Sequence, residues 1–64
     1  MATELDVQTP DDGQLYLAAS KKDPGRFVLS LTDTSGAGAE VKLDAFDLLR
    51  LIHAGSRLLM EQGL

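Results

Sequence analysis

Apolar and polar residues alternate over two stretches in the first half of the chain, and this period of two predicts β-strands. The stretches run from Gln14 to Ser20 and from Arg26 to Thr32. Between them, Lys21 to Gly25 combines Pro24 with Gly25, a pair typical of a tight turn, so the two strands are expected to form a hairpin. The residues expected on its buried face are Leu15, Leu17, Ala19, Phe27, Leu29 and Leu31.

Two shorter segments predict further strands on either side of this hairpin. Leu5 and Val7 alternate with polar neighbours, and the turn formers from Thr9 to Gly13 would end that strand. Whether this acidic segment, residues 1–13, joins the sheet is left open. After a loop of small residues from Asp33 to Ala39, Glu40 to Leu43 predicts a brief strand whose Val41 and Leu43 join the core.

A single amphipathic helix is expected to follow the last strand. Asp44 is a good N-cap, Asp47 lies in the first turn where the helix dipole favours an anion, and Gly63 can end the helix. One narrow polar stripe contains Asp47, Arg50, Ala54, Arg57 and Glu61. The remaining surface is largely apolar and contains Phe46, Leu48, Leu49, Leu51, Ile52, Leu58, Leu59 and Met60.

This apolar surface is wider than the stripe of about 100° that a helix needs to sit on one sheet. The predicted fold is α+β, an antiparallel sheet of three to four strands with the C-terminal helix packed on one face. A second copy of the helix, related by a two-fold axis, would cover the rest. The alternative is that the extra leucines pack on strand edges. The expected dimer interface contains Leu48, Leu51, Ile52, Gly55, Leu58 and Leu59.

Length and composition limit the class of protein. A chain of 64 residues forms one domain with a small core, so oligomerisation is a natural supplement to its stability. The chain has no cysteine, which excludes disulfides and thiolate metal sites and suits a reducing compartment. Residues 1–8 lack the pattern of a signal peptide, and no run of residues is apolar enough to span a membrane. We therefore expect a cytoplasmic protein with no membrane association.

The candidate catalytic residues are few. His53 is the only histidine, and it has no companions at the spacing of a metal site or a catalytic triad. Asp11 and Asp12 are best explained as turn residues, and Asp44 and Asp47 as helix-start residues. We expect neither enzymatic activity nor a cofactor.

The outward face of the predicted hairpin is the best candidate for a binding surface. The net charge is −4, yet residues 14–32 carry Lys21, Lys22 and Arg26 against Asp23 alone. Single-stranded nucleic acid is bound by surfaces of this kind, because cations contact its phosphates, an aromatic ring stacks on a base and short hydroxyl side chains reach base edges. The same composition is also that of an ordinary solvated sheet face. The candidate residues are Tyr16, Ser20, Lys21, Lys22, Arg26, Ser30, Thr32 and Lys42.

The stretch from Leu15 to Leu31 resembles the opening hairpin of the PUR repeat of purine-rich-element-binding proteins, most clearly at Gly25-Arg26-Phe27. The downstream order is similar, and the Whirly and positive-cofactor folds share it. The resemblance implies four antiparallel strands and a helix, two copies intertwined through their helices, and single-stranded DNA or RNA on the sheets. Lys21, Lys22 and Arg26 would then contact phosphates, and Ser20 and Ser30 would approach bases.

An interaction module of a different class is compatible with the same dimer. In that alternative the acidic strand and loops bind a protein partner, and no nucleic acid is bound.

Overall fold

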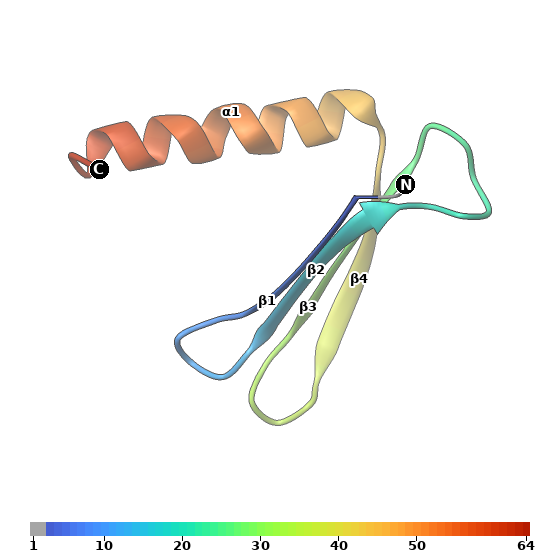
Figure 1. Ribbon diagram of the computed structural model, residues 1–64, viewed down its shortest axis with the longest axis horizontal. Helices are drawn as coiled ribbons and strands as arrows, with labels where there is room; N and C mark the ends of the chain where they lie inside the picture. The colour runs from blue at the N-terminus through green and yellow to red at the C-terminus, as the bar shows by residue number, and fades with distance from the viewer. Residues whose placement is uncertain (1–2) are drawn as a thin grey trace.

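The computed structural model describes residues 3–64 and contains four strands followed by one helix (Figure 1). The elements are β1 (Glu4–Gln8), β2 (Gln14–Ala19), β3 (Phe27–Thr32), β4 (Gly38–Leu43) and α1 (Ala45–Glu61). The strands form one antiparallel sheet in the order β1-β2-β3-β4. The predicted α+β fold is confirmed, and the first segment is a strand of the sheet.

The strand register places nearly all the apolar strand residues on one face of the sheet. Leu5 pairs with Leu17, Leu17 with Leu29, and Leu29 with Val41, so one apolar row crosses all four strands. Because side chains alternate along a strand, the neighbouring rows on this face are also apolar. We call this the apolar sheet face; its residues are Leu5, Val7, Leu15, Leu17, Ala19, Phe27, Leu29, Leu31, Ala39, Val41 and Leu43.

The loop between β3 and β4 is closed by the side chain of Asp33. Its Oδ1 accepts hydrogen bonds from the hydroxyl of Ser35 at 2.6 Å, the backbone N–H of Ser35 at 2.9 Å and the backbone N–H of Ala37 at 3.1 Å. These bonds lower the pKa of Asp33, that from the Ser35 hydroxyl most strongly. With its loop closed in this way, β4 begins at Gly38, two residues before the predicted start.

Both ends of the helix are capped as the sequence predicts. The Asp44 carboxylate accepts the backbone N–H of Asp47 at 2.8 Å, and the Asp47 carboxylate accepts the N–H of Asp44 at 3.2 Å. At the other end Gly63 has a φ of 78°, and its N–H donates to the carbonyl of Met60 at 3.0 Å. The hydrogen bond from the Asp47 N–H lowers the pKa of Asp44.

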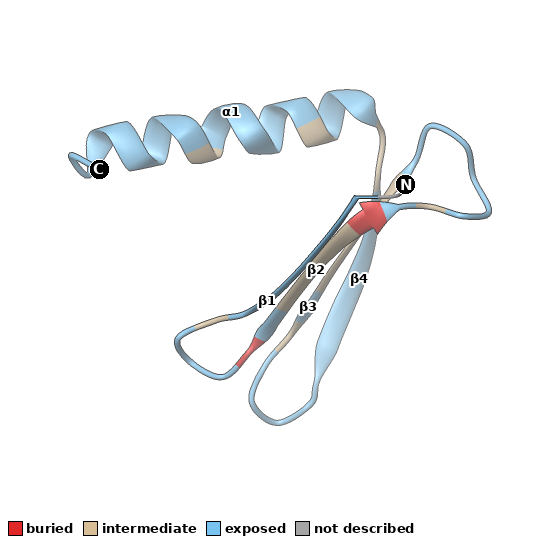
Figure 2. Ribbon diagram, in the orientation of Figure 1, coloured by how far each residue is buried: buried red, intermediate tan, exposed pale blue. Residues whose placement is uncertain are grey.

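The helix meets the sheet only at its start and then projects clear of it (Figure 1). Leu48, in the first turns, lines a shallow hollow with Leu5, Leu17 and Phe27 of the apolar sheet face. Beyond that point the helix is almost entirely exposed, as its pale colour in Figure 2 shows. Among residues 3–64, Ala18 is the only hydrophobic residue classed as buried, at 9% exposure.

The chain is consequently more open than a folded protein of its length. Its Cα radius of gyration is 13.1 Å, whereas a compact domain of this length has a radius of about 10.7 Å. Its accessible surface is 5479 Å², about 1,500 Å² more than the roughly 4,000 Å² expected for a monomer of 6.9 kDa. The secondary structure is complete in one chain, but the core is not.

Candidate interaction surfaces

The predicted dimer interface lies along one side of α1. With about 100° between successive residues, its six members fall within an arc of about 120°. Leu48 and Gly55 are partly covered, and the other four are exposed. Ile52 and Leu58 are each 59% exposed, which is far more than a single-chain core would leave.

A second apolar flank on the same helix lies outside the predicted interface. Phe46 is 73% exposed, Leu49 is 61% exposed and Met60 is 76% exposed. With His53, they recur at intervals of three, four and seven residues, which places side chains along one helix face. That spacing was the signal available in the sequence for a second contact stripe. Part of this flank is hollowed, between Leu49, Ile52, His53, Ser56, Arg57 and Met60.

The apolar sheet face is the second uncovered surface, although the alternation of its residues predicts a buried core. Leu31 and Val41 are about half exposed, at 50% and 51%, and Leu5 and Val7 are exposed as well. The alternation identified the correct face. The helix covers only one end of that face, because it diverges from the sheet after its first turns (Figure 2).

The opposite side of the sheet, the outer face, contains Tyr16, Ser30, Thr32 and Lys42, as predicted. The central row across this face runs from Asp6 to Tyr16, Ser30 and Glu40, so carboxylates lie at both ends of it. The pKa of Tyr16 is raised, first by partial desolvation and then by the charge of Glu4, a hydrogen bond with Glu4 and the charge of Asp6. The ring of Tyr16 therefore lies in a negative environment.

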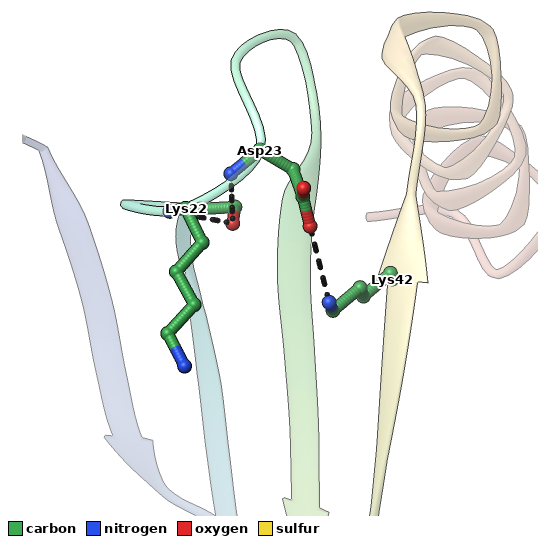
Figure 3. A network of polar contacts seen from close by, with 4 residues as sticks. Lys22, Asp23 and Lys42 are labelled. Carbon is green, nitrogen blue, oxygen red and sulfur yellow. Dashed lines mark hydrogen bonds and ion pairs between the residues drawn. The ribbon is translucent and has the colours of Figure 1, made fainter.

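Two of the four predicted cations are paired with carboxylates. The Nζ of Lys42 lies 3.1 Å from Oδ2 of Asp23, and Figure 3 shows Asp23 reaching across from the β2–β3 turn to it. Arg26 lies 4.0 Å from Asp44, at the limit of an ion pair. These side chains are about half exposed, so each pair contributes little to stability. They do, however, reduce the positive charge available to a phosphate.

The remaining candidates lie at the turn between β2 and β3. Within the described part of the chain, neither Lys21 nor Lys22 forms an ion pair, and the side chain of Lys22 extends away from Asp23 (Figure 3). The Ser20 hydroxyl accepts the backbone N–H groups of Lys22 at 3.3 Å and Asp23 at 3.1 Å. Ser20 thus stabilises the turn.

The described residues contain no cluster of three or more His, Asp or Glu side chains that could hold a metal ion. Over the same range, no helix has both the length and the apolar character needed to cross a bilayer.

No protein-family model, curated protein or solved structure matches this chain.

Proposed function

We propose that this chain is a self-associating protein-interaction module whose folded unit contains at least two copies. The observation that carries this proposal is the accessible surface of 5479 Å², about 1,500 Å² more than a compact monomer of this mass would expose. A standard interface buries about 800 Å² on each partner and an obligate homodimer interface about 1,000–2,500 Å² on each, so the excess is of the size that an obligate dimer interface removes.

The exposed surfaces have the composition of an interior. The apolar sheet face and the apolar arc of α1, formed by the residues of the predicted dimer interface, approach each other at the start of the helix, where Leu48 lines one hollow with Leu5 and Leu17. Single monomers rarely expose a contiguous apolar patch larger than about 600 Å². A second copy offers the same two surfaces, so each chain can bury its helix against apolar residues of the other.

The outer face would remain exposed in such an assembly and is available to a further partner. Its central row holds Asp6 and Glu40, and Glu4 lies beside Tyr16. Negative potential of this kind attracts basic protein segments and repels phosphates. For this reason we place protein interaction ahead of nucleic-acid binding.

Single-stranded nucleic-acid binding is the second candidate, and one observation favours it. Lys21, Lys22, Arg26 and Lys42 all lie at the same end of the sheet, around the β2–β3 turn. Phosphate contacts supply most of the affinity of such proteins, so this cluster is where a strand would bind. Asp23, Asp44 and Glu4 lie at the same end and nearly cancel its charge.

Sedimentation velocity and light scattering at micromolar concentration test self-association. The wild type should sediment as two chains or a multiple of two. The Ile52→Lys variant places a charge in the apolar arc and should raise the dissociation constant of the complex at least tenfold. The matched control Ala54→Lys puts the same charge in the polar stripe and should leave the mass unchanged. A monomeric wild type at these concentrations would contradict the proposal.

Titration of labelled single-stranded oligonucleotides at low and moderate salt tests the second candidate. Binding that weakens with salt, and that is lost when Lys21 and Lys22 are both changed to Glu, would establish nucleic acid as a ligand. An absence of binding at low salt would remove that candidate and leave protein interaction.

A further inference from the structure

The two edges of the sheet differ in how they can pair with another strand. In the β3–β4 hairpin the N–H of Asp33 donates to the carbonyl of Ala37 at 2.8 Å. Hydrogen-bonded pairs alternate along an antiparallel ladder, so Ala39, Val41 and Leu43 direct their backbone groups to β3. The backbone groups of Glu40 and Lys42 therefore point away from the sheet, along the free edge of β4.

We propose that β4 pairs antiparallel with β4 of a second copy, with Val41 on the two-fold axis, to form a continuous eight-stranded sheet. In this register Glu40 of each chain lies opposite Lys42 of the other. These residues have outward-pointing backbone groups, so they exchange backbone hydrogen bonds, and their side chains meet on the outer face with opposite charges. On the apolar sheet face, Leu43 lies opposite Ala39.

Neighbouring registers are disfavoured by charge. Shifting the centre to Glu40 puts the two Glu40 side chains opposite each other, and shifting it to Lys42 does the same with the two lysines. Side chains alternate between the faces, so sliding one strand by a single residue would place residues of the apolar sheet face opposite residues of the outer face. The register centred on Val41 is the one that pairs opposite charges and apolar residues together.

The other edge of the sheet lacks this charge complementarity. The N–H of Thr9 donates to the carbonyl of Gly13 at 2.8 Å, so by the same alternation Glu4, Asp6 and Gln8 present the free backbone groups of β1. Centring two β1 strands on Asp6 places the two aspartates opposite each other, and centring them on Leu5 brings Glu4 opposite Asp6. Centring them on Val7 pairs Asp6 with Gln8, so no register of this strand pairs opposite charges. Like charges on an edge are a recognised barrier to strand pairing.

This edge interface is separate from the apolar surfaces of the proposed function. It joins backbone groups at the β4 edge and charged side chains of the outer face, and on the apolar sheet face it involves only the β4 residues at the rim, whereas the other contact buries the helix and the rest of that face. The two contacts together build an assembly of four chains when their two-fold axes are perpendicular. That assembly size rests on the proposed function, whereas the edge pairing itself does not.

A single cysteine tests the register. The chain contains no cysteine, so Val41→Cys introduces one thiol per copy. Residues on the two-fold axis form a non-hydrogen-bonded pair with Cα atoms about 4.5 Å apart, which a disulfide can span. Mild oxidation should give a disulfide-linked pair of chains on a non-reducing gel. The matched control Ala39→Cys should not cross-link, because the register separates the two Ala39 residues by about 13 Å along the strands.

A charge exchange tests the same interface without oxidation. Lys42→Glu puts like charges opposite each other at both symmetric positions and should weaken edge pairing about tenfold. The double variant Glu40→Lys, Lys42→Glu restores the complementary pairs and should recover the wild-type association. Both variants lose the contact between Lys42 and Asp23 within the chain. If association recovers in the double variant, the weakening in Lys42→Glu therefore comes from edge pairing and not from the loss of that contact.

The outcomes distinguish the two contacts. A Val41→Cys variant that associates but does not cross-link, or a double variant that stays as weak as Lys42→Glu, would overturn the edge interface and leave the proposed function intact. A Val41→Cys variant that cross-links while Ile52→Lys leaves the mass unchanged would support the edge and remove the apolar contact.

Discussion

The sheet and the helix both form their local hydrogen bonds within one chain, but the helix does not bury its apolar side chains there. The sheet closes its turns with its own backbone and side chains, as the hydrogen bonds of Asp33 and Ser20 show. The helix is equally well capped, through Asp44 and Asp47, yet its apolar arc has almost nothing to pack against. Hydrogen bonding is local and can be completed in 64 residues, whereas apolar burial depends on the size of the unit.

The largest expected effect comes from the centre of the apolar sheet face. Leu29 lies in the row that crosses all four strands. If a second copy covers this row, Leu29→Ala should lower the free energy of unfolding by about 2–4 kcal/mol per chain. Urea denaturation monitored by circular dichroism measures this loss. A loss below about 1 kcal/mol would mean that the face stays open to water.

The next effect tests how tightly the sheet itself is built. A Cβ on Gly38 would lie 2.5 Å from the carbonyl oxygen of Leu31, so Gly38→Val should cost about 1–3 kcal/mol of unfolding free energy. The neighbouring change Ala39→Val adds similar bulk to the exposed apolar side of the strand and should cost much less. Thermal or urea denaturation compares the two. A cost for Gly38→Val as small as that for Ala39→Val would show that β4 tolerates bulk on both sides.

Removing the helix cap should have a moderate effect. Asp44→Ala removes the acceptor for the Asp47 N–H and should lower the free energy of unfolding by less than Gly38→Val does. Circular dichroism at 222 nm during denaturation measures the loss, with Asp11→Ala in the exposed first turn as the control. A similar change in both variants would indicate a general charge effect.

The same cap predicts a dependence on pH. The folded-state pKa of Asp44 lies below its ordinary value of 3.8, so the charged carboxylate stabilises the folded chain. This contribution is fully present above the ordinary pKa and is lost as the pH falls through the folded-state pKa. Stability measured from pH 6 to pH 2 should therefore fall in acid, and Asp44→Asn should flatten part of the fall. Asp33, whose pKa is lowered too, accounts for a further part that Asp33→Asn removes.

The smallest effect concerns the outer face. Tyr16 has a raised pKa, partly from the charge of Glu4 and a hydrogen bond with it. Glu4→Gln should lower the pKa of Tyr16 towards its ordinary value of 10.0, as measured by ultraviolet absorbance during alkaline titration. Glu61→Gln, at the far end of the helix, is the control and should leave the titration unchanged. If Glu4→Gln also leaves it unchanged, Glu4 does not set the potential at Tyr16.

The sequence predicts β2, β3, β4, the helix and its caps because their signals are local, whereas it leaves open whether β1 joins the sheet. The alternation in Gln14 to Ser20 and the spacing of Asp44, Asp47 and Gly63 each act within a few residues. The candidate site was only partly predictable. The position of Tyr16 on the outer face follows from alternation, but its carboxylate neighbours Glu4 and Asp6 come from β1 through pairing register.

The amino-acid sequence by itself determined the elements, the face on which each side chain lies and the excess of apolar residues on the helix. These follow from short-range hydrogen bonding and from the periods of strands and helices. Only the tertiary structure decided that α1 leaves the apolar sheet face uncovered, that Lys42 lies beside Asp23 and that the backbone of Glu40 lines a free edge. Those features depend on strand order, register and the direction in which the helix leaves Asp44, which bring together residues far apart in the chain.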